Sequence, residues 1–280
     1  MSCLEILTSL ELGLIYGIVA TGIYFAFQVL DFPDLTCDGS FMVGSAVIVS
    51  SIQNGISPSI ALILATCASG LCGLTTGVLY AYGRISNLLS GILTAFMLYS
   101  INLRIMGNTP NLSLPQGIGI QNIDILIIMA IIVWSMSSYI LTTDFGLALR
   151  SVGTNPRLAN IYGISTNKYI IIGLMISNAL IGMGGALFCL QQGFSDISQG
   201  IGTVVVGLAA IIIGKKILFS KSLWLNILSC IIGSIVYRFV VAIGLHSSGI
   251  GLKASDMNIL TGLILIALMF FSERKLLCYR

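Results

Sequence analysis

The chain has 280 residues, of which 56% are apolar and only 8% are charged, and its formal net charge is +3. Soluble domains carry about 25% charged residues, so this sequence has too few charges to cover a water-facing surface. Three long stretches, 39–83, 125–143 and 169–195, contain no charged side chain. Runs of about 18 or more apolar residues are typical of transmembrane helices. The composition therefore excludes a soluble globular protein and predicts a membrane protein.

Nine hydrophobic segments follow one another along the chain. They cover residues 12–30, 39–53, 58–82, 86–106, 123–142, 169–190, 200–214, 222–243 and 257–272. Backbone groups inside lipid must be paired within their own segment, which favours helices. We therefore expect an all-α polytopic membrane protein with about nine transmembrane helices, of which the second and seventh are short enough to be partial or tilted spans.

Positive side chains are concentrated in four connecting regions. These regions are Arg84, the stretch 144–168, the turn 215–221 and the end of the chain at 274–280. Loops rich in Lys and Arg remain cytoplasmic, and placing all four inside lets every segment between them cross consistently. This predicts a bacterial inner-membrane protein with its N-terminus outside and its C-terminus in the cytoplasm. Arg104 and Arg238 then lie in the outer parts of their segments, where each either pairs with an acid or extends to the interface, and His246 lies in an outer loop without an assigned role.

Two short motifs recur in the same order in the two halves of the chain. Phe32-Pro33-Asp34-Leu35-Thr36 is matched by Phe194-Ser195-Asp196-Ile197-Ser198, and Asn87-Leu88-Leu89-Ser90-Gly91 by Asn258-Ile259-Leu260-Thr261-Gly262. The predicted topology places the first Phe-x-Asp motif on the inner side and the second on the outer side. Residues 1–280 therefore form one domain with an inverted repeat, 12–106 and 169–272, joined by 123–168. Inverted repeats are typical of alternating-access transport; the alternative is turn chemistry shared without common ancestry.

The stretch 144–168 is the longest hydrophilic part of the chain. Asn155 followed by Pro156 predicts a helix start, because an Asn side chain caps the first turn and proline fits the first helical position. Gly163 suits the left-handed residue that ends a helix. The two-turn helix between them, up to Tyr162, is too short to be stable alone in water. It must pack on a surface, which is either a partner protein at the cytoplasmic face or the chain's own helix bundle.

Three acids, Asp31, Asp34 and Asp38, lie between the first two hydrophobic segments. Ionisable groups at membrane depth usually face the bundle interior or water. A discontinuous helix here would line a translocation path, and because the second half repeats the motif we include Phe32, Asp34, Asp38, Phe194 and Asp196 in that path. The alternative is that Asp31 ends the first helix and that Asp38 caps the second.

The whole pattern resembles a known family. Gly153-Thr154-Asn155-Pro156, Ala159 and Gly163-Ile164, followed by Gly182-Met183-Gly184-Gly185-Ala186, look like the branched-chain amino acid and ribose permease family of ABC importers. The stretches 30–41, 98–107 and 192–214 look like its less characterised branch, which is linked with tryptophan or tyrosine uptake. The resemblance covers nearly the whole chain.

The resemblance implies a fold similar to that of cobalamin-type importers. It implies that two copies of this chain pair around one path, that two ATPase subunits bind at the cytoplasmic turns, and that a substrate-binding protein delivers an amino acid from outside. The ATPase coupling segment would consist of Gly153, Thr154, Asn155, Pro156, Arg157, Ala159, Tyr162 and Gly163. ATP and Mg²⁺ would be bound by the ATPase and no cofactor by this chain, whose remaining partner is membrane lipid. One departure from the family is a missing first helix, which leaves nine spans rather than ten.

The sequence also indicates how well three other classes of function fit, namely secondary transporters, enzymes and channels. The chain lacks a G-x-x-x-x-G-K-[ST] sequence, so ATP hydrolysis would have to come from a partner. An ion-gradient-driven secondary transporter remains the alternative, although it usually needs more charged groups at mid-membrane. An enzyme is disfavoured because the chain has a single His and no paired catalytic carboxylates, and a channel because no ring of pore residues is apparent. Seven scattered cysteines predict neither disulfides nor a metal site, and we expect no nucleic-acid partner.

Overall fold

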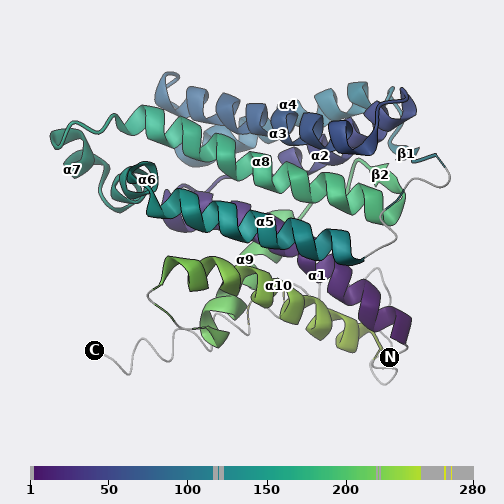
Figure 1. The fold of residues 1–280 in the computed structure, drawn as a ribbon. Helices are drawn as coiled ribbons and strands as arrows, with labels where there is room; N and C mark the ends of the chain where they lie inside the picture. The colour runs from purple at the N-terminus through teal and green to yellow at the C-terminus, as the bar shows by residue number, and fades with distance from the viewer. Residues whose placement is uncertain are drawn as a thin grey trace.

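The computed structural model describes residues 3–115, 119, 123–218, 220, 222–246, 262 and 266. Its helices are α1 (Cys3–Tyr24), the π-helical turn η1 (Phe25–Val29), α2 (Thr36–Gln53), α3 (Pro58–Ala81), α4 (Asn87–Ile105), α5 (Ile123–Thr142), α6 (Asp144–Thr154), α7 (Pro156–Ile161), α8 (Thr166–Gln192), α9 (Thr203–Ile217) and α10 (Leu223–His246). Two strands, β1 (Asn111–Ser113) and β2 (Phe194–Asp196), complete it. The short helix α7 lies at one end of the bundle and the two strands lie at the other (Figure 1).

Six of the described helices are long and apolar enough to cross a membrane. They are α1 continued into η1, α3, α4, α5, α8 and α10. The predicted polytopic helical architecture is thus confirmed. The predicted count of nine is not confirmed, because α2 and α9 are not among the six. The ninth predicted segment, 257–272, lies outside the described residues except for residues 262 and 266.

The position of α2 explains why this helix is less apolar than its neighbours. It lies inside the bundle, in contact with α3, α4, α8 and α9. Its side chains therefore face protein rather than lipid, and polar residues such as Ser40 and Ser45 are fully buried beside Phe41 and Ile48. A helix surrounded by protein can satisfy buried hydroxyl groups with neighbouring polar atoms, which hydrocarbon cannot provide.

The two strands correct the expectation of an all-α chain. β1 and β2 pair antiparallel, with Leu112 opposite Ser195. The ladder is extended by Leu114 N–H, which donates to the Gly193 carbonyl at 2.8 Å. Residues 194–196 lie between two predicted helices, and they form a strand because the segment between α4 and α5 passes close enough to supply backbone partners. That pairing joins residues about 80 positions apart and leaves no local pattern in the sequence.

The longest helix, α8, runs from the α7 end to the strand end and packs against α1, α2 and α3 (Figure 1). A Cβ atom on Gly44 of α2 would lie 1.9 Å from the Gly182 carbonyl oxygen of α8. A Cβ on Gly185 would lie 2.0 Å from the Phe41 carbonyl oxygen. Small residues at helix interfaces allow such close backbone approach in membrane proteins. The glycine-rich stretch 182–186 therefore lets the backbone of α8 approach that of α2 closely.

Arg238 of α10 is directed toward the bundle. Its guanidinium carbon lies 4.0 Å from the ring centre of Tyr16 on α1, a geometry in which the aromatic face attracts the cation. The two helices are also joined by Ser234, whose hydroxyl donates to the Gly13 carbonyl at 2.8 Å. Arg238 thus stabilises the contact between α1 and α10. This contact differs from the two roles expected from the sequence, which were pairing with an acid and extension to the membrane interface.

We expect Gly44→Ala to destabilise the chain, because the added methyl group would overlap the backbone of α8 and force the helices apart. Overpacking of this kind costs about 1–3 kcal/mol. The thermal midpoint of the detergent-purified protein should fall by several degrees. Gly70→Ala provides the matched control, since its Cβ would meet the nearest atom at 3.4 Å, and an unchanged midpoint for Gly44→Ala would contradict the packing argument.

Candidate functional site

Helix α7 is built from its own capping residues. The Asn155 side-chain oxygen accepts a hydrogen bond from Leu158 N–H at 3.1 Å, and Pro156 is the first helical residue. The helix ends at Ile161, and Gly163 follows with φ of +81°, a conformation that glycine adopts without steric cost. The predicted start, proline position and left-handed glycine are thus confirmed. The role of this segment in contacting an ATPase stays a prediction.

The exposed side of α7 is apolar. Leu158, Ile161 and Tyr162 are 50%, 80% and 76% exposed, whereas Ala159 is only 3% exposed and attaches the helix to the bundle. The predicted coupling residues are spread over α6, α7 and the turn after it. Gly153 and Thr154 end α6, and Asn155 caps α7. Pro156, Arg157 and Ala159 lie in α7, and Tyr162 and Gly163 follow it. An exposed apolar face on a short helix is a surface that a partner protein can cover.

Helix α6, which precedes α7, was not expected from the sequence. The Thr143 hydroxyl caps its first turn by accepting from Gly146 N–H at 3.4 Å, and Leu149 and Val152 are buried on one side. A Cβ on Gly153 would lie 2.0 Å from the Val29 carbonyl oxygen of η1. Helix α6 therefore lies directly against the end of the first transmembrane helix.

The end of the first transmembrane helix is irregular. Its last turn, η1, is π-helical, and Asp31 follows with φ of +52°. Single π-helical turns often mark functional positions. Beside this turn lies a cavity of about 420 Å³ lined by Gln28, Asp31, Arg150 and Gly153, among others. The buried Arg150 Nε has no hydrogen-bond partner among the described residues. The π-helical turn, the cavity and the close approach of Gly153 to Val29 thus all lie where α6 meets η1.

Asp34 is fully buried behind this irregular turn. One carboxylate oxygen accepts from Thr36 N–H at 2.8 Å, and the other accepts from the Asn178 amide of α8 at 2.7 Å. The Asn178 oxygen accepts in turn from the Ser40 hydroxyl at 2.6 Å. Burial raises the pKa of the Asp34 carboxyl, whereas the hydrogen bonds from Thr36 and Asn178 oppose that rise. Asp34 is therefore part of a buried polar network between α2 and α8.

Phe32 is also buried, and its ring packs edge-on against Tyr80 of α3 with centres 5.1 Å apart. Asp34 and Phe32 are therefore enclosed by helices in this conformation, and their contact with a translocation path stays a prediction. Sequence reasoning missed Asn178. The available signal was that Asn178 is the single Asn or Gln in the hydrophobic segment 169–190, and such lone amides often hydrogen-bond across helices.

Asp38 lies in the first turn of α2, and its carboxylate caps a different helix. It accepts from Gly202 N–H at 3.1 Å and from Val204 N–H at 3.0 Å, at the start of α9. The expectation that Asp38 caps its own helix is wrong: α2 begins at Thr36, and the Thr36 N–H is bound by Asp34. A carboxylate at a helix N-terminus satisfies free N–H groups and complements the helix dipole.

Phe194 and Asp196 lie in β2, at the strand end of the molecule. Asp196 accepts from Ser198 N–H at 2.8 Å, which is the same two-residue turn that Asp34 makes with Thr36. The two motif aspartates are not brought together: Asn178, which binds Asp34, precedes β2 by 14 helical residues of α8, about 20 Å. The two matching motifs therefore form the same turn. The inverted repeat itself stays a prediction.

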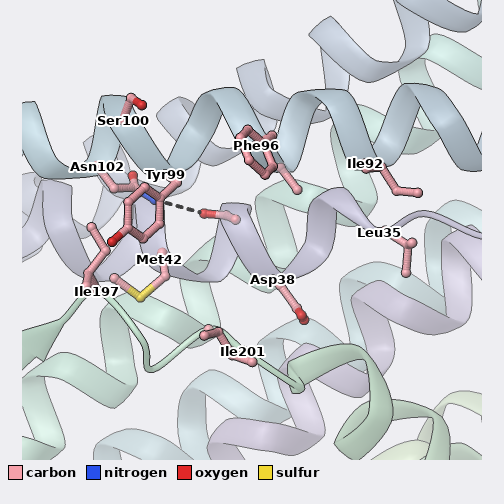
Figure 2. Close-up of a pocket in the computed structure, with 13 residues that line it drawn as sticks. Leu35, Asp38, Met42, Ile92, Phe96, Tyr99, Ser100, Asn102, Ile197 and Ile201 are labelled. Atoms are coloured by element: carbon pink, nitrogen blue, oxygen red, sulfur yellow. Dashed lines mark hydrogen bonds between the residues drawn. The ribbon is translucent and has the colours of Figure 1, made fainter.

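The described residues also form a second cavity, of about 420 Å³, between α2, α4 and the segment 197–201 (Figure 2). Asp38 is the one predicted site residue that lines it. In the described part of the chain, no group of three or more His, Cys, Asp or Glu side chains is placed to hold a metal ion. The site therefore consists of an open, largely apolar pocket beside α4 and, separately, the exposed helix α7.

Comparison with known proteins identifies the family. Residues 5–272 match the family described as "Branched-chain amino acid transport system / permease component". The chain belongs to this family. It is 38% identical to the "Tyrosine transport system permease protein" of Clostridioides difficile (strain R20291), over 94% of this chain and 90% of that protein. It is 41% identical to the "Nucleoside ABC transporter permease protein NupC" of Lactococcus lactis subsp. cremoris (strain MG1363), over 32% of this chain and 27% of that protein.

Among solved structures, a chain of "PsaBC from Streptococcus pneumoniae in complex with Fab" has a similar fold. The TM-score is 0.56 at 16% sequence identity, and the match covers 93% of this chain and 89% of that chain. The family and the six apolar helices establish a multi-pass permease of the bacterial plasma membrane, of the ABC importer class, that works with ATPase and substrate-binding components.

We expect Asp34→Asn to reduce transport while leaving the amount of folded protein unchanged. The substitution preserves shape, but whichever way the new amide is turned, its nitrogen faces a donor, either the Asn178 amide or Thr36 N–H. The exchanged pair Asp34→Asn with Asn178→Asp should recover part of the activity, because one donor and one acceptor again face each other. Uptake by membrane vesicles measures both variants, and Asp31→Asn, at an exposed position, serves as the control. Unchanged uptake in Asp34→Asn would refute a role for this carboxylate.

Proposed function

We propose that this chain is the membrane-spanning permease subunit of an ABC importer for an amino acid, and that α7 is the helix on which its ATPase binds. The observation that carries the proposal is the exposure of the apolar residues Leu158, Ile161 and Tyr162 on a helix of six residues. A helix this short is not stable alone, yet its apolar side chains are left uncovered by its own bundle. This favours a partner protein over a loop helix that packs only on its own chain.

The distribution of charge supports placing the α7 end in the cytoplasm. Basic residues of three of the four basic connecting regions gather at this end of the bundle. They are Arg84, Arg150, Arg157, Lys168, Lys215 and Lys216. Two contacts connect these turns: the Lys215 ammonium donates to Gln28 beside the Arg150 cavity, and Asn167 donates to the Ala81 carbonyl near Arg84. Basic turns remain on the cytoplasmic side, so the N-terminus and the two strands would face outward and the C-terminus would be cytoplasmic.

In this assembly two copies of the chain surround one path and two ATPase subunits bind below them. ATP and Mg²⁺ belong to the ATPase, since the chain has no G-x-x-x-x-G-K-[ST] sequence. A substrate-binding protein would dock at the strand end. The relatives with ABC transporter permease names weigh against an ion-gradient-driven secondary transporter. The amino acid cargo is supported by the tyrosine permease relative, which matches nearly the whole chain, whereas the nucleoside permease relative matches about a third.

Two contacts provide routes by which movement of α7 reaches the membrane interior. The Asn160 side-chain oxygen accepts from Thr166 N–H at 3.4 Å, which connects α7 to the start of α8. Gly153 brings α6 against the Val29 carbonyl of η1, just before the loop that carries Asp34. ATP-driven displacement of α7 would therefore act on α8 and, through η1, on the loop that carries Asp34, which are the two segments that the Asp34–Asn178 hydrogen bond connects.

We expect the double variant Ile161→Ser and Tyr162→Ser to lose its ATPase partner during gentle purification of the tagged chain. The two side chains are largely exposed, so the permease itself should keep its thermal midpoint, while the apolar contact area for the partner is removed. Asn111→Ala, an exposed residue at the strand end, is the control. If a well-folded wild-type chain purifies without any ATPase, under conditions that preserve a known importer, the proposal fails in favour of a secondary transporter.

We expect Gly153→Val to separate ATP hydrolysis from transport. The added side chain would displace the Val29 carbonyl and disturb the contact between α6 and η1, whereas the exposed face of α7 remains available to the ATPase. The complex should still form and hydrolyse ATP, but uptake per ATP should fall at least tenfold. Gly70→Ala should behave as wild type. Equal losses of complex formation and uptake would show that Gly153 only supports folding.

A further inference from the structure

The cavity between α2, α4 and residues 197–201 has the dimensions of a small-molecule site. Its volume of about 420 Å³ falls within the range of about 300–1,000 Å³ typical of ligand pockets. The side chains that matter for its chemistry are Asp38, Met42, Phe96, Tyr99 and Asn102; in Figure 2 Tyr99 extends from α4 toward Met42 of α2, and Asp38 points toward Ile201. Most of the remaining lining is aliphatic, which gives the cavity an apolar wall.

Asn102 has an unused hydrogen-bond acceptor at this cavity. The residue is only 1% exposed. Its amide nitrogen donates to the Gly39 carbonyl at 3.4 Å, the dashed line in Figure 2, and this bond determines which end of the amide carries the donor. Its oxygen is buried and has no partner among the described residues. Buried polar atoms are nearly always paired, so an unpaired carbonyl oxygen in a cavity wall indicates a place for a ligand's donor group.

The charge of the cavity is negative. Asp38 lies in its wall, and none of the lining residues is Lys, Arg or His. The Asp38 carboxylate already accepts from the Gly202 and Val204 N–H groups. It therefore contributes its negative charge to the cavity rather than a free hydrogen-bond acceptor. A carboxylate in a wall without cationic side chains disfavours an anionic solute and favours one that carries an ammonium group. The Tyr99 hydroxyl can donate to a ligand's acceptor.

From these features we propose that the cavity is a binding site of the permease itself for a free amino acid with an aromatic or large apolar side chain. The ammonium group donates to the Asn102 oxygen within the field of Asp38. The side chain lies along Met42 and Phe96, and the carboxylate accepts from the Tyr99 hydroxyl. A sugar would leave several hydroxyls unpaired against the aliphatic wall, which costs free energy. This inference rests on the proposed function and adds that the permease, besides its delivery protein, selects the cargo.

The test uses the wild-type permease with its ATPase in lipid nanodiscs, without the substrate-binding protein. Radiolabelled L-tyrosine is the probe, and unlabelled 3-(4-hydroxyphenyl)propionate, which lacks the ammonium group, and D-ribose are the competitors. We expect saturable L-tyrosine binding. The propionate should compete at least tenfold more weakly than unlabelled L-tyrosine, and D-ribose should not compete. Absence of saturable binding, or equal competition by D-ribose, would overturn the proposal.

Variants at position 102 test whether the Asn102 oxygen binds the ammonium group of L-tyrosine. Asn102→Leu, close in size but without an acceptor, should weaken L-tyrosine binding at least tenfold, and Asn102→Gln, which keeps both an acceptor and a donor for Gly39, should retain more of it. Met97→Leu, an exposed residue of α4 that does not line the cavity, is the matched control. Unchanged binding in Asn102→Leu would overturn the assignment. ATPase co-purification and basal hydrolysis, measured on the same samples, test the proposed function separately: if both persist without L-tyrosine binding, only the cavity site fails.

Discussion

The contact of α8 with α2 and α3 is the constraint on which the remaining structure depends. Gly44, Gly182 and Gly185 allow backbones to approach where any side chain would collide. Lipid provides no hydrophobic driving force between helices, so close packing and interhelical hydrogen bonds must hold them together. The hydrogen bond between Asn178 and Asp34 is made at this interface. The close backbone contacts and the interhelical hydrogen bond therefore both involve α8, which runs from α7 to the strands.

The acids of the first half are bound to elements of the second half. Asp34 accepts from α8 and Asp38 accepts from the start of α9. Both carboxylates are hydrogen-bonded in this conformation. Such pairing lowers the free-energy cost of an ionisable group inside a membrane protein. Any change that separates the halves must break these bonds or replace their donors. A contact of these residues with a transported solute stays a prediction.

The two ends of the molecule have different chemistry. At the α7 end, an exposed apolar helix is surrounded by basic turns and lies next to an irregular π-helical segment. At the strand end, the packed segment 194–202 covers α2 and borders the apolar cavity with the unpaired Asn102 oxygen. The helices α8 and α1 connect these ends. An ATPase acting at one end and a solute binding toward the other would therefore share a continuous set of packed elements.

The sequence by itself determined the membrane class, the family and the local structure of α7. Apolar runs set the long helices, because lipid requires each segment to pair its own backbone. Asn155, Pro156 and Gly163 set the ends of α7, because capping acts within a few residues. The shortness of the second and seventh apolar segments was also apparent from the sequence. Only the tertiary structure decided that α2 lies inside the bundle, that β1 pairs with β2, and that Asp38 caps α9. These features join residues far apart in the chain, so no pattern within a single segment could reveal them.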